Sequence, residues 1–513
     1  MAREIVESSF RLPLYTDYNG AGIPFAYPPL GMYLAALLTS AFGISLFTLY
    51  TWLPTLISIG TIFAAFAVAR RLLTDEWEVV LTVLIFAVLP SGFQWVIAGG
   101  GITRSLGLLF LLLALSELLA LTQGGGYARL VTTALLLSLC ILSHLEYGLV
   151  ASLAVVIIVL FSPQETQDKL LQVSLIGLLA LTLTSPWWFI IISRHGLDPF
   201  LSAQSTGESL GNPLEMVLLV GRSFTGEPML PVIGLLSIVG FFVLLAEREW
   251  MLPIWVTAIL FVARRSFGAT LSIAIAILAA VALTRLLIPG LRNKLAQSDV
   301  VSADHSPIVA QGLVALMTTS ILIYAAHGVF QLDQQLGTPL HVLFPTERAA
   351  MEWVSQNTPD DSQFLVITSS VSWQSDAASE WFPVLASRPS RGTVQGAEWL
   401  NGSFERVIQS YFGLQACAAS SDPACVTTWS QSYERPYTHV YLTQLVTGAI
   451  GPALANSPDY ELVYEQDGIR IYEFKPGPFT VYLNQGDRYR SQLDFAAALT
   501  AYQTAIEFDP SNP

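Results

Sequence analysis

Long apolar stretches without any charge constrain this chain more than any other feature. A helix needs about 20 mostly apolar residues to cross the hydrocarbon core of a bilayer. Only 12% of the 513 residues are charged, against roughly a quarter in soluble domains. The sequence therefore predicts a polytopic α-helical membrane bundle over 47–330. Asp, Glu, Lys and Arg are all absent from 79–103, 170–193, 228–246, 266–284 and 306–326.

Charge in the short connections predicts how this bundle is oriented. One alternate set of connections contains Arg70 and Arg71, while the other contains Arg104 and His144. The first set has more Lys and Arg in total, which assigns it to the cytoplasm. The other set and the C-terminal soluble part are then extracytoplasmic. The ten predicted spans are 47–69, 79–93, 104–122, 129–143, 147–162, 170–193, 229–246, 250–263, 266–284 and 308–329.

The first 46 residues leave two alternatives open. No charge occurs between 18 and 69, which is long enough for two spans. Segment 28–46 is interpreted as a helix on the outer surface, so that 1–46 form an outer loop and a surface helix. As a further span, the same segment would place residue 1 in the cytoplasm. Arg3 is followed by polar residues and not by the apolar core of a signal peptide.

The C-terminal part has the composition of an acidic soluble domain. From Gln331 to Pro513 there are 20 acidic and nine basic residues, a net charge of −11. Because a nucleic-acid partner needs a basic face, no nucleic acid is expected. Residues 331–478 are predicted to form a small α/β domain. Its expected elements are a helix over 347–355, a strand over 364–368, and a hairpin of 460–464 with 469–474 around Asp467-Gly468.

Three cysteines are present. Cys417 and Cys425 lie eight residues apart in the soluble part. A disulfide between them is permitted in an oxidising compartment, but the spacing leaves paired and free thiols equally open. Cys140 falls in an apolar span and is interpreted as a small buried side chain.

The last 35 residues, 479–513, match the spacing of a 34-residue helix–turn–helix repeat. Small Ala side chains let two helices approach closely, and aromatic side chains fill the groove between them. The pattern resembles a tetratricopeptide (TPR) repeat. One such repeat cannot bury its apolar face alone, so we expect the chain either to continue into further repeats or to dock this pair on the preceding domain. The matching residues are Tyr482, Gly486, Tyr489, Ala498, Tyr502, Ala505 and Pro510.

Two outer turns carry the residue types that bind phosphate. In 98–105, three glycines leave main-chain N–H groups accessible, and Arg104 adds a cation beside a helix N-terminus. Arg264 and Arg265 are predicted to lie at the outer interface, where unpaired cations are costly and usually functional. Arg104, Arg264 and Arg265 are therefore candidate lipid-phosphate ligands. In the alternative interpretation both turns are structural, and the arginine side chains simply reach out to water.

A third outer turn, 143–146, places His144 two residues before Glu146. A histidine and a carboxylate are able to act as a base and its orienting partner, although residues two apart do not share a helix face. The alternative is that both residues only terminate apolar spans. Segment 20–33, rich in Gly and Pro ahead of an apolar helix, is either a substrate-lining loop or a helix start.

In the soluble domain, 373–388 gathers aromatic rings, carboxylates and an arginine. Aromatic faces stack on sugars or peptides, while carboxylates bind hydroxyls or amides, so the segment is a candidate acceptor-binding site. In the structural alternative, Trp381 belongs to the core and Asp376 is a helix N-cap. The candidate acceptor-binding residues are Trp373, Asp376, Glu380, Trp381 and Arg388.

Several classes of chemistry find no support in the sequence. It contains no P-loop, dinucleotide-binding fingerprint, zinc-ligand spacing or hydrolase serine elbow. We therefore expect no nucleotide, no metal and no other cofactor.

Taken in order, these features resemble the GT-C class of membrane glycosyltransferases. That class includes protein O-mannosyltransferases, aminoarabinose transferases and oligosaccharyltransferase catalytic subunits. The likeness covers residues 1–476, mainly as an order of features. It is carried by Tyr27-Pro28-Pro29-Leu30 after the first outer loop, Pro90 before the turn at 98–105, the pair Arg264-Arg265 that opens a late span, and the Trp/Asp/Glu segment that leads to Ala386-Ser387-Arg388.

The resemblance implies a GT-C-like bundle in the plasma membrane and a sugar donor built on a polyprenyl phosphate or pyrophosphate. Transfer would take place at the outer face. By position, Arg264 and Arg265 would match the family's phosphate-binding arginine, and 373–388 would match its acceptor side. The expected partners are the polyprenyl-phosphate-linked sugar, membrane lipids and a protein bound through the TPR-like repeat.

Two departures from the family pattern concern the catalytic groups. The family's catalytic carboxylate lies in the first outer loop just after a first span, and no span precedes residue 28 here. The start of the chain is therefore expected to be missing. The acidic pair of the oligosaccharyltransferases is absent from 99–104, so the metal-independent branches fit better. The candidate catalytic residues that remain are Glu7, Asp17, His144 and Glu146.

Two other functions stay open at this point. A non-catalytic membrane scaffold would use 479–513 to recruit an extracytoplasmic protein. A lipid-linked-sugar transporter would move the donor without modifying an acceptor.

Overall fold

The chain folds into two compact units. The computed structural model describes residues 1–97, 101–206, 230–262, 267–296, 312, 315–327, 343–402 and 404–508. Two segments from the N-terminal half belong to the C-terminal unit. The membrane unit comprises Met1–Leu14, Phe25–Leu197 and Gly207–His341, and the C-terminal unit comprises Tyr15–Pro24, Asp198–Thr206 and Val342–Pro513.

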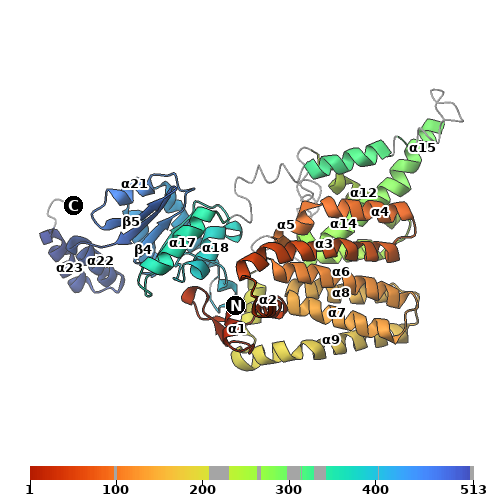
Figure 1. The fold of residues 1–513 in the computed structure, drawn as a ribbon, viewed down its shortest axis with the longest axis horizontal. Helices are drawn as coiled ribbons and strands as arrows, with labels where there is room; N and C mark the ends of the chain where they lie inside the picture. Colours follow the sequence, from red (N-terminus) through yellow and green to blue (C-terminus); the bar gives the residue numbers. More distant parts are fainter. Residues whose placement is uncertain are drawn as a thin grey trace. The chain divides into compact units, whose positions relative to one another are not determined.

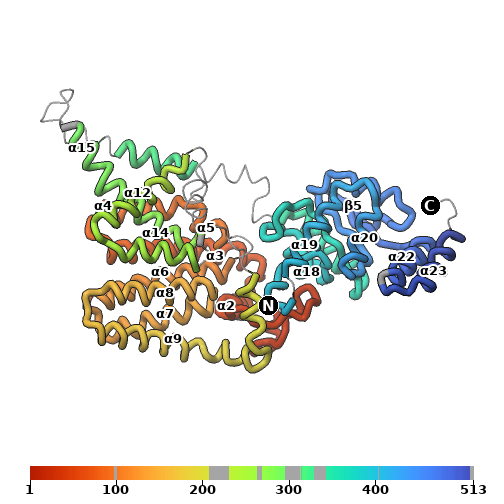
Figure 2. Tube along the Cα trace, turned by 180° about the vertical axis from the view of Figure 1, so that it is seen from behind, coloured from red at the N-terminus to blue at the C-terminus, as the bar shows by residue number. Residues whose placement is uncertain are grey.

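The membrane unit is a bundle of apolar helices in which α6 to α9 pack side by side and α14 contacts both α4 and α12 (Figures 1 and 2). Helix α6 and the continuous helical stretch Gly268–Lys294 are the most buried long helices, with 78% and 72% of their apolar windows covered. Helices α3 and α9 are covered over 39% and 28%, as expected where a helix faces lipid. The helices are α1 (Ala2–Glu7), α2 (Leu30–Phe42), α3 (Leu46–Leu72), α4 (Glu76–Val88), α5 (Pro90–Ile97), α6 (Ile102–Thr122), α7 (Tyr127–Ser143), α8 (Leu145–Leu160), α9 (Thr166–His195), α12 (Val232–Ala246), α13 (Met251–Val262), α14 (Phe267–Val281), the π-helix η3 (Ala282–Leu287) and α15 (Ile288–Ala296).

By length and composition, four helices within the described ranges are able to cross a membrane: α3, α6, α9 and Gly268–Lys294. Helices α4 and α5 together form a fifth candidate span, bent by 44°. The chain is therefore a multi-pass membrane protein. Each of the ten predicted spans overlaps an apolar helix within the described residues, several of them with only 10–17 residues. The last, 308–329, is described only at 312 and 315–327. That all ten cross the membrane stays a prediction.

Capping residues mark where several of these helices begin and end. At the start of α3, Ser45 Oγ accepts the N–H of Thr48, and at the start of α4, Asp75 Oδ1 accepts two N–H groups. Helix α2 ends at Gly43, whose φ of 66° is left-handed. Its 13 residues extend about 20 Å, less than the roughly 30 Å of a bilayer core. Helix α13 is equally short, so the surface-helix interpretation of 28–46 stays a prediction.

The C-terminal unit is built on a four-stranded sheet in the order β3-β4-β6-β5, with β3 parallel to β4 and the other pairs antiparallel. Helices cover both faces of this sheet (Figures 1 and 2). Since successive strand residues point to opposite faces, Leu365 and Ile367 pack with α19 and α20, while Phe364 and Val366 pack with α17 and α18. The predicted strand 364–368 and hairpin 460–474 correspond to β3 and to β5–β6. The elements are β1 (Tyr15–Thr16), η1 (Tyr18–Gly20), β2 (Ile23–Pro24), α10 (Asp198–Ser205), α17 (Pro345–Asn357), β3 (Phe364–Ile367), η4 (Trp373–Ser375), α18 (Ala377–Leu385), η5 (Ala397–Trp399), α19 (Phe404–Ala416), η6 (Cys417–Ala419), α20 (Ala424–Ser432), β4 (His439–Leu442), α21 (Ile450–Ala455), β5 (Tyr460–Gln466), β6 (Ile469–Phe474), α22 (Pro478–Ser491) and α23 (Phe495–Phe508).

The two cysteines of the C-terminal unit, Cys417 and Cys425, form a disulfide that joins η6 to α20. The structure thus decides the question that their spacing left open. Cys140 is buried and unpaired with another cysteine, as interpreted from its apolar surroundings.

The last two helices, α22 and α23, form a helical hairpin. The ring of Tyr482 stacks on that of Phe508 at 5.6 Å. A Cβ atom at Gly486 would lie 2.4 Å from the ring of Tyr502, so the two helices approach too closely for a larger residue there. The hairpin is attached to the preceding domain by a hydrogen bond of 2.6 Å, which Gln431 of α20 donates to Asn484 Oδ1 of α22. The TPR assignment itself stays a prediction, and Pro510 lies outside the described residues.

Candidate functional site

Polar and aromatic side chains gather in the membrane unit where α6 begins and α7 passes into α8. The hydroxyl of Tyr27, just ahead of α2, lies 3.2 Å from Thr103 Oγ1 in the first turn of α6. The ring of His144, between α7 and α8, lies 6.4 Å from the ring of Tyr27 and 4.5 Å from that of Tyr147. We call Tyr27, Thr103, Arg104, His144 and Tyr147 the Tyr27 cluster.

Two glycines allow this cluster to form. A Cβ at Gly107 of α6 would lie 2.6 Å from the Tyr147 ring and 3.0 Å from His144 Cβ. A Cβ at Gly31 of α2 would lie 2.9 Å from the methyl group of Thr103. Since such contacts are shorter than van der Waals packing permits, side chains at either position would push α2 or α8 away from α6. Glycine at both positions therefore holds Tyr27 and His144 near the start of α6.

Arg104 is the cation of this cluster. It is the third residue of α6, where unpaired N–H groups give the helix end a partial positive charge. Its Nη1 donates to the main-chain oxygen of Trp95 at 3.2 Å, the one hydrogen bond described for this side chain. A guanidinium has five N–H donors, so the remaining ones suit a phosphate oxygen. Arg264 and Arg265, the other two predicted phosphate ligands, lie outside the described residues.

The predicted catalytic carboxylates fall in different segments of the chain, two in the membrane unit and one in the C-terminal unit. Glu146 is in the first turn of α8, two residues after His144, and is half-buried. Glu7 is the last residue of α1, exposed, and paired with Arg3 Nε at 3.7 Å. Asp17 is exposed and belongs to the C-terminal unit. The structure thus places Arg104, His144 and Glu146 at neighbouring helix ends of the membrane unit, and their catalytic roles stay predictions.

In segment 373–388, Asp376 is 4% exposed and fully engaged. Its Oδ1 accepts the N–H of Ser379, which makes it the N-cap of α18, as in the structural interpretation. Its Oδ2 accepts the hydroxyls of Thr368 and Tyr411, both at 2.6 Å. Burial raises the pKa of this carboxyl, and the three hydrogen bonds oppose that rise. Asp376 therefore links α18, β3 and α19.

Arg388 is also buried within the C-terminal unit. Its Nε donates to the main-chain oxygen of Pro359 at 2.7 Å, and its Nη2 donates to that of Thr358 at 2.6 Å. Both carbonyls lie at the C-terminal end of α17, where a cation is favourable. Asp360, which is almost fully exposed, pairs with the same guanidinium at 2.9 Å. Arg388 thus closes the end of a helix.

The other three candidate acceptor residues reach the surface in part. Trp373 is half-buried, and its ring stands edge-on to that of Phe404 at 5.8 Å. Glu380 and Trp381 are half-buried on α18, whereas the neighbouring Phe382 enters the core. An acceptor-binding role for Trp373, Glu380 and Trp381 is therefore compatible with their exposure, and it stays a prediction.

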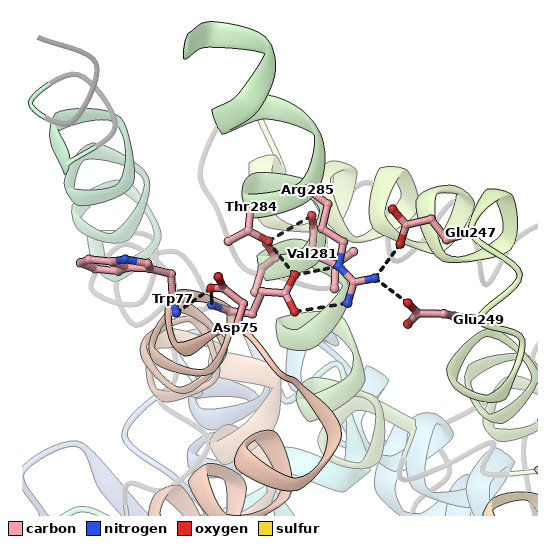
Figure 3. Close-up of polar contacts among 9 residues, drawn as sticks. Asp75, Trp77, Glu247, Glu249, Val281, Thr284 and Arg285 are labelled. Atoms are coloured by element: carbon pink, nitrogen blue, oxygen red, sulfur yellow. Dashed lines mark hydrogen bonds and ion pairs between the residues drawn. The ribbon is translucent and has the colours of Figure 1, made fainter. Parts of the chain in front are cut away.

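A charged cluster around Arg285 was not foreseen from the sequence (Figure 3). Arg285 Nε donates to Glu78 Oε1 at 2.7 Å, and its Nη1 donates to Glu247 at 2.6 Å and to Glu249 at 2.8 Å. Thr284 also donates to Glu78, which is 3% exposed. Figure 3 shows the guanidinium enclosed by carboxylates from α4 and from the connection between α12 and α13. Among the described residues, no group of His, Cys, Asp or Glu is arranged to hold a metal ion.

Similar folds occur among solved membrane proteins. The apo oligosaccharyltransferase of Archaeoglobus fulgidus superposes with a TM-score of 0.52 at 13% identity, covering 86% of this chain and 64% of that one. ArnT of Cupriavidus metallidurans in the apo state superposes with a TM-score of 0.53 at 15% identity, covering 92% of this chain and 91% of that one. The chain thus spans less than two thirds of the length of the oligosaccharyltransferase. No protein-family model and no curated protein sequence matches the chain.

Both neighbours are GT-C glycosyltransferases. At such low identities the likeness establishes the fold and leaves the chemistry untested. The chain therefore has a GT-C-like fold, as the resemblance in its sequence predicted.

Proposed function

We propose that this chain is a membrane glycosyltransferase that moves a sugar from a polyprenyl-phosphate donor to an acceptor at the outer face of the membrane. The observation that carries the proposal is the GT-C-like fold, shared over 92% of the chain with ArnT. The Tyr27 cluster adds an arginine at a helix N-terminus, with one hydrogen bond among the described residues, a site that suits a phosphate. The positive-inside assignment supports an extracytoplasmic C-terminal unit, and the resemblance to the GT-C class supports the plasma membrane.

In the proposed reaction, the acceptor oxygen attacks the anomeric carbon of the sugar from the face opposite the phosphate. The new carbon–oxygen bond forms as the bond to phosphate breaks, which inverts the anomeric configuration. The acceptor proton passes to a carboxylate, for which Glu7, Asp17 and Glu146 are the candidates. Arg104, with Arg264 and Arg265, stabilises the negative charge that develops on the leaving phosphate. No metal takes part.

The proposal is tested by reconstituting the protein in vesicles with radiolabelled polyprenyl-phosphate sugars and membrane fractions as acceptors. The wild type should transfer label, and the double variant Arg264→Ala, Arg265→Ala should lose transfer while being inserted normally. Arg70→Ala, Arg71→Ala removes a matched arginine pair at the end of α3 and should keep transfer. Undiminished transfer in the Arg264, Arg265 variant would end the proposed role of the pair.

A scaffold function is a second candidate because α23 exposes apolar side chains. Phe495, Leu499 and Ile506 are each more than half exposed, as expected of a TPR-like hairpin that packs against a further helix. Capture of a protein that depends on 479–513, without any label transfer in the vesicle assay, would favour this function. Movement of the donor across the vesicle membrane without acceptor modification would favour a transporter.

A further inference from the structure

Segment Tyr15–Pro24 is a short hairpin whose ends join the membrane unit and whose body belongs to the C-terminal unit. Its strands β1 and β2 pair through Tyr15 with Pro24 and Thr16 with Ile23. At its base, in the membrane unit, the N–H of Phe25 donates to the main-chain oxygen of Leu14 at 3.1 Å. The hairpin is therefore closed at its base by main-chain hydrogen bonds.

The tip of this hairpin is attached to the C-terminal unit by Asn19. Its Nδ2 donates to the main-chain oxygen of Ser390 at 2.8 Å, and its Oδ1 accepts the N–H of Ser390 at 2.6 Å. Ser390 in turn forms a bridge with Phe364 at the start of β3. The carboxamide thus satisfies both main-chain groups of one residue, as a neighbouring strand would at the edge of a sheet.

Two further contacts support the same attachment. The hydroxyl of Tyr18, which is half-buried, donates to the main-chain oxygen of Glu380 on α18 at 2.7 Å. Ile23 packs against Gly396, where a Cβ would lie 2.4 Å from Ile23 Cδ1 and where φ is +88°. Tyr18, Asn19 and Ile23 therefore each contact a different part of the rest of the C-terminal unit.

We propose that Asn19 is a positioning residue that fixes the hairpin Tyr15–Pro24 and thereby the start of the loop that leads to Tyr27. The chain passes from the hairpin through Phe25 and Ala26, both fully buried, directly to Tyr27 of the Tyr27 cluster. A displaced loop lowers the rate of the chemical step more than it weakens the binding of donor or acceptor. Misplacement by about 1 Å lowers rates by up to 100-fold. The inference rests on the proposed transferase function.

The deciding variant is Asn19→Gly. Asn19 has a φ of 60°, which glycine adopts without strain, so this change removes both hydrogen bonds and keeps the backbone. We expect kcat for transfer to fall about tenfold, in line with two lost hydrogen bonds of moderate strength, while the KM values for donor and acceptor change less than about twofold. Asn19→Asp keeps the acceptor for the Ser390 N–H and should fall in between. Asn401→Gly, at an exposed asparagine of the same unit, is the matched control.

A second measurement does not depend on activity. Chymotrypsin cleaves after aromatic residues, and the half-buried Tyr18 is held in the attached hairpin by its hydrogen bond to Glu380. Cleavage after Tyr18 should therefore be several-fold faster in Asn19→Gly than in the wild type or in Asn401→Gly. An unchanged cleavage rate, or faster cleavage with unchanged kcat, overturns the inference. A wild type without transferase activity ends the proposed function instead, and the cleavage rate then decides alone whether Asn19 attaches the hairpin.

Discussion

Two arginines of the membrane unit, Arg285 and Arg104, are held in opposite ways. Arg285 donates to three carboxylates, one of which, on Glu78, is almost completely buried. Arg104 has one described hydrogen bond, to a neutral main-chain oxygen. The first guanidinium has its donors engaged within the protein, whereas the part of the chain that the structure describes offers the second only one acceptor.

The difference separates an arginine that holds helices together from one that is available to a ligand. A buried ion pair adds little net stability over apolar packing, but removing one partner leaves an uncompensated charge and is strongly destabilising. A cation at a helix N-terminus gains nothing from the helix dipole, so its placement there needs another reason. In the proposed function, the donor phosphate supplies that reason for Arg104.

The largest effect is expected for Arg285→Ala. It leaves Glu78 buried without its cation, and we expect the free energy of unfolding to fall by about 3–5 kcal/mol. Denaturation of the detergent-solubilised protein by SDS, followed by tryptophan fluorescence, measures this change. Arg3→Ala is the control, since Arg3 pairs with Glu7 where both side chains are 62% exposed and should cost less than about 1 kcal/mol. Equal stability of both variants would contradict the proposal that Arg285 holds these helices together.

Arg104→Ala should show the reverse pattern. We expect kcat/KM for transfer to fall by about 100-fold or more, as when one donor to a developing negative charge is removed. Its free energy of unfolding should stay within about 0.5 kcal/mol of the wild type, as for other substitutions that break no buried network of ion pairs or hydrogen bonds. The comparison fails if Arg104→Ala destabilises the protein as much as Arg285→Ala does.

A smaller effect is expected at a buried carboxylate for which no ion pair is described, Glu347 of α17. Burial raises its pKa to about 7, although the N–H of Phe344 donates to it and opposes that rise. The folded protein therefore keeps this proton between about pH 4.5 and 7 while the unfolded chain loses it, so stability falls as pH rises through that window.

Glu347→Gln should remove this pH dependence, because glutamine keeps an acceptor for the Phe344 N–H. Relative to the wild type, the variant should gain more than about 1 kcal/mol in going from pH 5 to pH 8. Unfolding midpoints at the two pH values measure the gain, with Glu352→Gln, exposed on the same helix, as the control. An identical pH dependence in the wild type and Glu347→Gln would show that the carboxyl titrates normally.

Patterns confined to one element were predictable from the sequence. Apolar runs located the membrane helices, and Asp467-Gly468 marked the turn between β5 and β6. Asp376 was recognised as a possible N-cap because its position ahead of a helix is enough to define that role. The paired state of Cys417 and Cys425 was not decided, since a separation of eight positions in the sequence specifies no distance in space.

Contacts between distant segments were not predictable. Tyr27 and Thr103 lie 76 residues apart, and Glu78 and Arg285 lie 207 apart. No periodicity links such residues. The local sequence around a carboxylate at the end of a span does not show whether a distant arginine pairs with it. The burial of Arg388 was missed for the same reason, because its partners are main-chain carbonyls at the end of α17, which no side-chain pattern reveals.

The sequence by itself determined that this chain is a multi-pass membrane protein with an acidic soluble part, because a bilayer demands apolar length and water demands charge, and both are read residue by residue. Only the tertiary structure decided which cations are engaged and which stay available. It also assigned the hairpin Tyr15–Pro24 to the C-terminal unit. Those outcomes depend on hydrogen bonds between segments brought together by folding, and their energies are set by burial and distance rather than by position in the chain.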